Sequence, residues 1–289
     1  MAAFEGPIVD VWPSQSEVYL GESVFLQCRL ESNFSSAWTY RWYRNNTNTT
    51  LTLNPRHSVC GDSYSITAVT SQDAGSYWCR AEQRERNITT EVEVQLRVSA
   101  LLHPSLALTP SSRQVFSGER VAVQCPARTR NNSSGWKLWH FSPEEKNKRQ
   151  MCVNHSNACV FVADRANSGL YWCEEAEGRS RAINITVSYG NIILKTPAFS
   201  VHHGGTVVLH CQYRTGNQNE TIFFKNGIAI NTSETTLNLT MEKVTQQEEG
   251  LYKCGSQDRK MESKESWLSV TLDGVHSKNC ICEVSRSSS

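Results

Sequence analysis

The residues in this sequence with the most distinctive chemistry are its cysteines. The 289 residues include 11 of them, and cysteine at that density forms either disulfides or, with histidine, metal sites. The eight histidines do not lie at ligand spacing to a Cys-x-x-Cys pair, so we expect disulfides rather than zinc. Disulfides form and persist in oxidising compartments. The cysteine content therefore predicts an extracellular protein.

Asparagines in N-glycosylation sequons point to the same compartment. One Asn-x-Ser/Thr pattern is weak evidence because it is common, but many of them beside regularly spaced cysteines indicate a secreted or cell-surface glycoprotein. The expected acceptors are Asn33, Asn45, Asn48, Asn87, Asn131, Asn132, Asn154, Asn184, Asn219, Asn231 and Asn238.

Catalytic and cofactor chemistry has no matching pattern. Gly-x-Ser-x-Gly, the Walker loop, Gly-x-Gly-x-x-Gly and His-Glu-x-x-His are all absent from the sequence. The acidic pairs Glu144-Glu145 and Glu174-Glu175 are adjacent, so on strands their side chains would point to opposite faces. The net charge of +1 favours no nucleic acid, and no apolar run approaches the roughly 20 residues that span a bilayer. We expect no enzyme, no metal and no cofactor.

A repeated pattern shows which elements must position the cysteines. Three times a glycine precedes a cysteine by seven residues, in Gly21–Cys28, Gly118–Cys125 and Gly204–Cys211. Apolar residues alternate between them, as in Val24, Leu26 and Cys28, which predicts a strand with one face in a core. Each repeat then closes with Gly-x-Tyr-x-Cys, ending at Cys79, Cys173 and Cys254.

This combination is typical of immunoglobulin-like sandwiches, in which a tyrosine two residues before the second cysteine forms the tyrosine corner. It predicts the disulfides Cys28–Cys79, Cys125–Cys173 and Cys211–Cys254. An aromatic residue on the third strand should pack on each disulfide, and Trp42 and Trp139 both lie 14 residues after the first cysteine of their repeat. In the third repeat Phe223 or Phe224 takes that place. The expected core aromatics are Trp42, Trp139, Phe223, Tyr77, Tyr171 and Tyr252.

The predicted fold class is all-β, with three tandem immunoglobulin-like β-sandwich domains of the C2 or I type. The paired cysteines are separated by 51, 48 and 43 residues, which leaves little room for the additional strands of a variable domain. The expected ranges are 7–100 for domain 1, 104–188 for domain 2 and 191–272 for domain 3. Residues 273–289 form a polar, cysteine-containing tail.

Five cysteines remain outside the core pairs. Cys152 and Cys159 are close enough for a local bridge in domain 2, or they are thiols with other partners. Cys60, Cys280 and Cys282 are then an odd number, which in a secreted protein often means intermolecular pairing. The tail cysteines could link two chains into a dimer, or one of them could bond Cys60.

The motifs resemble Fc receptors and Fc-receptor-like proteins, and among these the fish soluble Fc receptor and leukocyte immune-type receptors. The segments that carry the resemblance most clearly are residues 223–227 (Phe-Phe-Lys-Asn-Gly), 249–254 (Glu-Gly-Leu-Tyr-Lys-Cys) and 168–174 (Ser-Gly-Leu-Tyr-Trp-Cys-Glu). The resemblance covers roughly residues 8–272 and implies binding of an immunoglobulin Fc region. The two tryptophans with which mammalian Fc receptors clamp an Fc proline are absent, because Leu101-Leu102-His103-Pro104 and Gln212-Tyr213-Arg214 stand there. That particular contact is not expected here.

Charge suggests where a ligand would bind. Residues 104–188 carry 11 basic and 7 acidic groups, so domain 2 could steer an acidic partner or simply be soluble. The candidate ligand-binding residues are Lys146, Lys148, Arg149 and Trp136, with packing inside its own domain as the alternative for Trp136. The expected function is an extracellular immune receptor for an immunoglobulin heavy-chain constant region. The alternatives are an adhesion module or a decoy that binds a surface protein other than antibody.

Overall fold

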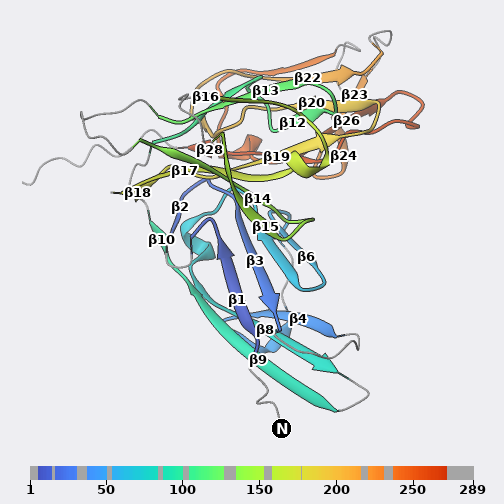
Figure 1. Cartoon of the computed structure of the whole chain (residues 1–289). Helices are drawn as coiled ribbons and strands as arrows, with labels where there is room; N and C mark the ends of the chain where they lie inside the picture. The colour runs from blue at the N-terminus through green and yellow to red at the C-terminus, as the bar shows by residue number, and fades with distance from the viewer. Residues whose placement is uncertain are drawn as a thin grey trace, which may run out of the picture.

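The computed structural model describes residues 6–14, 17–30, 38–50, 54–83, 87–99, 104–126, 135–152, 158–176, 178–215, 221–230 and 237–271, with the backbone alone for 46–50. It is all-β, with three two-sheet sandwiches in chain order (Figure 1). Within these residues, no helix is long and apolar enough to cross a membrane.

Domain 1 has two antiparallel sheets. The first runs in the order β1 (Ile8–Trp12), β3 (Val24–Arg29), β7 (Ser63–Ile66) and β6 (His57–Cys60). The second runs β5 (Asn46–Thr50), β4 (Thr39–Arg44), β8 (Gly75–Gln83) and β9 (Ile88–Leu96). The short strands β2 (Val18–Tyr19) and β10 (Val98–Ser99) pair in parallel, and the 3-10 turn η1 (Ser71–Asp73) precedes β8.

Domain 2 repeats this plan with a smaller first sheet. That sheet consists of β11 (Ala107–Thr109), β13 (Arg120–Gln124) and β16 (Ala158–Val162). The larger sheet runs β12 (Gln114–Phe116), β19 (Ile183–Ser188), β17 (Gly169–Glu175), β14 (Lys137–Ser142) and β15 (Asn147–Met151), and β18 (Gly178–Arg179) pairs with β17. The turn η3 (Arg165–Asn167) precedes β17.

Domain 3 has the same two layers. One sheet contains β20 (Ile192–Lys195), β22 (Val207–Tyr213) and β25 (Asn238–Met241). The other contains β24 (Ile228–Ile230), β23 (Thr221–Lys225), β26 (Gly250–Ser256) and β27 (Ser266–Leu268). A parallel pair joins β21 (Val201–His202) to β28 (Val270–Thr271), and η4 (Gln246–Glu248) precedes β26.

The disulfides and tyrosine corners lie where the repeats place them. The structure joins Cys28–Cys79, Cys125–Cys173 and Cys211–Cys254 within the three cores, and Cys152–Cys159 at the edge of domain 2. The hydroxyls of Tyr77, Tyr171 and Tyr252 each donate a 2.7 Å hydrogen bond to the backbone carbonyl four residues upstream. Each corner therefore ties the 3-10 turn to the strand that carries the second cysteine.

The structure corrects the prediction that Trp139 is the core tryptophan of domain 2. Trp42 and Phe223 lie opposite Cys79 and Cys254 across their strand pairs, but Leu138 lies opposite Cys173. Leu138 belongs to the domain 2 core, whereas Trp139 packs with a different cluster on the outer face. Side chains alternate faces along a strand, so a shift of one residue moves a side chain to the other face. Equal spacing from the first cysteine did not mean equal register.

His140, the next residue along β14, is fully buried in domain 2. Its Nε2 lies 3.2 Å from the Ser168 carbonyl oxygen, and its ring centroid lies 4.4 Å from that of Tyr171. Burial lowers the pKa of His140 to about 4, and the nearby Arg149 charge acts in the same direction. The folded domain therefore holds a neutral imidazole over a pH range in which the unfolded chain takes up a proton.

We expect His140 to make domain 2 acid-sensitive. As pH falls from about 6.5 toward 4, only the unfolded state is protonated, so stability should decline by roughly 1.4 kcal/mol per pH unit, about 3 kcal/mol by pH 4.5. The variant His140→Gln should lose less stability between pH 7.5 and 4.5 in urea unfolding. His203→Gln, at an exposed position, is the control. Equal acid sensitivity of His140→Gln and the wild type would contradict this.

Domain 1 packs against the larger sheet of domain 2 through aromatic rings. Trp12 stacks on Phe141 with ring centroids 5.0 Å apart, and Phe25 lies 5.3 Å from the same ring. Trp172 of β17 is fully buried beneath them. Because Trp12 and Phe25 stand on β1 and β3, the first sheet of domain 1 is the one that faces domain 2.

A buried ion pair crosses the same junction. Arg179 lies 2.7 Å from both carboxylate oxygens of Glu22, and both side chains are almost fully buried. The backbone N–H groups of Tyr19 and Ala182 also donate to Glu22, and the Arg179 guanidinium stacks 4.0 Å from the Tyr19 ring. The carboxylate and the guanidinium therefore depend on each other across two domains.

Domains 2 and 3 lie side by side and also share polar contacts (Figure 1). The Gln114 side chain donates to the Lys264 carbonyl and the Ser266 hydroxyl, each at 2.8 Å, and accepts from the Leu194 N–H. The Arg113 side chain donates to the Ala198 carbonyl at 2.9 Å. Both inter-domain junctions are therefore packed interfaces rather than open linkers.

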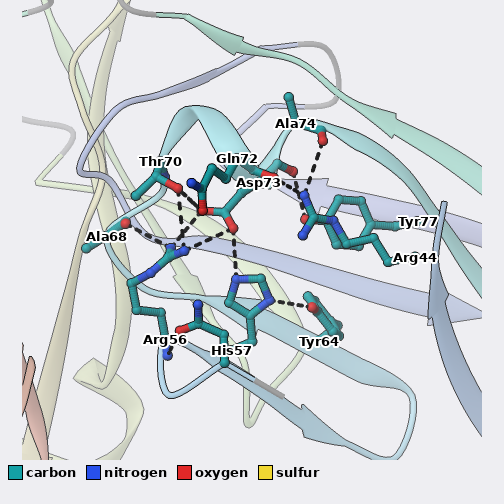
Figure 2. A network of polar contacts seen from close by, with 11 residues as sticks. Arg44, Arg56, His57, Tyr64, Ala68, Thr70, Gln72, Asp73, Ala74 and Tyr77 are labelled. Atoms are coloured by element: carbon teal, nitrogen blue, oxygen red, sulfur yellow. Dashed lines mark hydrogen bonds and ion pairs between the residues drawn. The ribbon is translucent and has the colours of Figure 1, made fainter. Parts of the chain in front are cut away.

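A second buried charge network lies inside domain 1 (Figure 2). Arg56 approaches Asp73 at 2.6 and 3.2 Å, and His57 donates from Nε2 to the same carboxylate at 2.9 Å. The other ring nitrogen of His57 lies 2.6 Å from the Tyr64 hydroxyl. The Thr70 N–H donates to Asp73 at 2.7 Å. The network anchors η1, which carries Asp73, to the start of β6 through Arg56 and His57.

Candidate functional site: the open face of domain 1

The outer face of the second sheet of domain 1 is the candidate binding surface. Trp12 and Phe25 of the first sheet pack against domain 2, and the other sheet lies on the opposite side of the core, on the part of domain 1 that extends away from domains 2 and 3 (Figure 1). We call its outward residues the open face: Arg41, Tyr43, Trp78, Arg80, Glu82, Glu91 and Glu93.

Strand alternation determines which side chains form the open face. Trp42 and Cys79 point into the core, so their neighbours along β4 and β8 point outward. Across the sheet Tyr43 lies opposite Trp78, and Trp78 lies opposite Glu93. The next row, from β4 to β9, is Arg41, Arg80 and Glu91. Aromatic, basic and acidic groups thus occur in adjacent rows on one surface.

The open face is held in order by its own contacts. The Arg80 guanidinium lies 4.9 Å from the centre of the Tyr43 ring, and its Nη2 lies 3.3 Å from a Glu91 oxygen. Arg41 lies 3.8 Å from Glu82 with 55% of its side chain exposed. Trp, Tyr and Arg are the residues that dominate protein interfaces energetically. The arrangement is therefore suited to recognising another protein.

The ligand site expected at the basic patch of domain 2 stays a prediction, and its side chains also make contacts within the chain. Lys146 pairs with Asp62 of domain 1 at 2.5 Å, and the Lys148 ammonium lies 4.2 Å from the Trp139 ring and 5.6 Å from that of Trp12. Arg149 donates to the Ala166 carbonyl at 2.9 Å. These cations are used within the chain, two of them at the junction with domain 1. Their charges can be counted in the sequence, but the sequence does not show that domain 1 packs beside them.

Trp136 packs half-buried against the core of domain 2, which corresponds to the alternative weighed for it. Phe224, the second candidate for the third core aromatic, faces outward beneath Lys253, whose ammonium lies 5.1 Å from its ring. Cys60 is exposed, and among the described cysteines it alone forms no disulfide. Cys280 and Cys282 lie outside the described residues, so an interchain bond stays a prediction.

Four expected glycosylation sites have described side chains. Asn45, Asn87 and Asn238 are exposed, and Asn184 is half-buried on β19. For Asn48 the structure describes only the backbone. The remaining sequons, at Asn33, Asn131, Asn132, Asn154, Asn219 and Asn231, lie outside the described residues. Glycosylation of all eleven stays a prediction.

Comparisons with known proteins agree with this architecture. Residues 7–82 match the family model described as immunoglobulin domain. The chain therefore carries an immunoglobulin domain over these residues. It is 26% identical over 167 residues to human Fc receptor-like protein 5, covering 53% of this chain and 17% of the relative. It is 25% identical over 211 residues to human Fc receptor-like protein 2, covering 65% and 40%.

Human contactin-3 is similar to the same extent. It is 24% identical over 203 residues, which cover 68% of this chain and 19% of contactin-3. The chain therefore spans less than half the length of each of these relatives. The matched segments are similar to Fc receptor-like proteins and to contactin-3, and what the whole relatives do is not transferred by these matches alone.

The alternation of residues along two strands of domain 1 indicates the open face, although no recognised motif includes these residues. Trp78, Arg80 and Glu82 alternate with core residues on β8, and Arg41 and Tyr43 flank Trp42 on β4. Reading the residues between the core positions would have listed this surface. It would not have shown that the surface is left uncovered, because that depends on how domain 1 packs against domain 2.

Proposed function

We propose that this chain is an extracellular immune receptor that binds an immunoglobulin heavy-chain constant region through the open face of domain 1. The similarity to two Fc receptor-like proteins over 167 and 211 residues supports the receptor class and carries the proposal. The four disulfides support an oxidising compartment.

The chemistry of the open face supports it as the ligand surface. Half-exposed Trp78 and Arg80 offer a rigid ring and a planar cation that lose little freedom on binding, and the buried Tyr43 ring supports the Arg80 guanidinium from below. The carboxylates of Glu82 and Glu91 offset the charges of Arg41 and Arg80. The open face therefore has no strong net charge that would favour an acidic partner. Recognition would then depend on shape and on specific pairs rather than on electrostatic steering.

The test is direct binding of the glycosylated protein to purified immunoglobulin of its own species, measured on a biosensor. Arg41→Glu should weaken binding by at least tenfold, since truncating or reversing a central arginine typically costs about 1–2 kcal/mol or more. Arg120→Glu, an exposed arginine on the first sheet of domain 2, should bind as the wild type does.

Two results would argue against the proposal. Absence of saturable binding at micromolar immunoglobulin, with the protein shown to be folded, would remove antibody as the ligand. Binding that Arg41→Glu and Arg120→Glu weaken equally would leave antibody as the ligand but move the site away from the open face.

A cell-surface protein other than antibody is the second candidate ligand. The similarity to contactin-3 spans as much of this chain as that to Fc receptor-like protein 2, at nearly the same identity. Adhesion predicts binding to cells in the absence of immunoglobulin, and a weak single contact strengthened when two chains are linked. Cell binding by Cys60→Ser and wild-type protein would show whether linkage through this cysteine contributes.

A further inference from the structure

A groove lies on the outer face of the larger sheet of domain 2, beside domain 3. Its walls are the turn at Pro143 and Glu144, the exposed Tyr189, and Glu262 and Lys264 from domain 3. Its volume is about 870 Å³, within the range of about 300–1,000 Å³ typical of sites that hold small molecules. The groove is therefore large enough for a ligand but is bounded by two domains that are already in contact.

Asn184 stands on β19 and lines this groove. It lies opposite Leu170 across the strand pair, and Leu170 belongs to the outer-face cluster with Phe141 and Trp172, so the Asn184 side chain also points outward. Asn184, Ile185 and Thr186 form a sequon. Within the described part of the chain, the Asn184 carboxamide makes no hydrogen bond, so its nitrogen is available for modification.

The groove offers chemistry that suits a sugar. Tyr189 is 61% exposed, and its hydroxyl accepts a 2.9 Å hydrogen bond from the Arg165 N–H, which fixes the ring at the edge of the groove. A sugar ring has an apolar C–H face that can lie on such a ring, as well as hydroxyls that need donors and acceptors. Glu144 and Arg165, 2.8 Å apart, supply both, and Lys264 supplies another donor.

We propose that Asn184 carries an N-linked glycan whose first sugars occupy this groove, stacked on Tyr189 and in contact with domain 3. The covalent link selects the occupant, because a tethered group experiences an effective concentration in the millimolar range at a site within its reach. The glycan braces domain 2 against domain 3, and it makes the groove unavailable to a peptide ligand. This inference is independent of which ligand the open face binds.

The test is enzymatic removal of N-glycans from the native secreted protein by peptide N-glycosidase in heavy-oxygen water, followed by mass spectrometry. Each released asparagine becomes a labelled aspartate, so every site reports its own rate. The Asn184 glycan should be released at least about tenfold more slowly than that of Asn87, since stacking and one or two hydrogen bonds together exceed the 1.4 kcal/mol that a tenfold difference represents. After unfolding, the rates should become equal.

Tyr189→Ala should raise the native release rate at Asn184 toward that at Asn87, because it removes the exposed ring on which the sugar stacks. Ile228→Ala, at another exposed apolar residue outside the groove, should change neither rate. An Asn184 found without glycan, a native rate equal to that at Asn87, or a slow rate that Tyr189→Ala leaves unchanged would each overturn the proposal.

Discussion

Replacing Arg179 with methionine is expected to lower the free energy of unfolding of domains 1 and 2 by about 3–5 kcal/mol, because removing one partner of a buried ion pair leaves the other charge buried and uncompensated. Methionine keeps most of the length of the side chain. Glu22 would keep its hydrogen bonds from the N–H groups of Tyr19 and Ala182 but would lose the guanidinium that bonds both of its carboxylate oxygens. Unfolding in urea, with the inter-domain arrangement followed by small-angle X-ray scattering, measures the effect.

Arg165→Met is the matched control for this prediction. Arg165 also pairs with a glutamate, but the side chains of Arg165 and Glu144 are 77% and 55% exposed, and exposed pairs contribute about 0–1 kcal/mol. The double variant Glu22→Gln with Arg179→Met should recover part of the loss, because no charge is then left buried. A cost for Arg179→Met no larger than that for Arg165→Met would show that the junction does not depend on the ion pair.

The cores and disulfides could be predicted from the sequence because a sandwich fixes their spacing. The glycine and the tyrosine before the second cysteine are required by local geometry: a Cβ on Gly169 would lie 2.1 Å from the Phe141 carbonyl oxygen, and the Tyr171 hydroxyl donates to the Asn167 carbonyl. Such constraints act within one domain and recur in each repeat. Trp139 could not be placed the same way, since its spacing from Cys125 equals that of Trp42 from Cys28 while its strand is paired one residue out of that register, with Leu138 opposite Cys173.

Two tryptophans at equivalent positions differ in whether another domain covers them, and this difference could not be predicted from the motifs. Domains 1 and 2 share the tripeptide Tyr-Trp-Cys, ending at Cys79 and Cys173. Trp78 is half-buried on the open face, whereas Trp172 is fully buried, with Trp12 of domain 1 packed 6.5 Å from it. One hint was present: residues 170–173, Leu-Tyr-Trp-Cys, form an unbroken apolar run, as expected for a strand buried on both faces. The identity of the covering surface came only from the packing of domains.

Replacing Asp73 with asparagine should destabilise domain 1 by about 3–5 kcal/mol at neutral pH, since it leaves the buried Arg56 without a carboxylate. The expected loss does not come from the hydrogen bond between residue 73 and the backbone of the turn. Asn167 occupies the same position in η3 of domain 2, where its Oδ1 accepts from the Asp164 N–H at 2.9 Å. An asparagine at residue 73 can therefore still accept a hydrogen bond from the Thr70 N–H. The stability lost in Asp73→Asn then measures the contribution of the carboxylate charge.

The matched control is Glu248→Gln at the same position of η4 in domain 3, where the carboxylate accepts from Thr245 and the structure shows no buried arginine beside it among the described residues. We expect a cost of about 1 kcal/mol or less there, as for a weakened cap. Urea unfolding of each single variant, followed by a probe in the affected domain, compares the two. Equal costs would mean that Asp73 acts as a cap and not as the counter-charge of Arg56.

The effect of Asp73→Asn should also depend on pH, with a definite sign. Burial alone would raise the pKa of Asp73, but hydrogen bonds from His57, Arg56 and the Thr70 N–H outweigh it and hold that pKa well below its usual range. The stabilisation is then complete above the unfolded-state pKa of about 3.9 and is lost as pH falls toward the folded-state value. The gap between wild type and variant should therefore be widest near pH 7 and should narrow at pH 2.5. A gap that stays constant would mean that the carboxylate charge contributes no stability, and that Arg56 is held by its contacts with Ala68 and Thr70 alone.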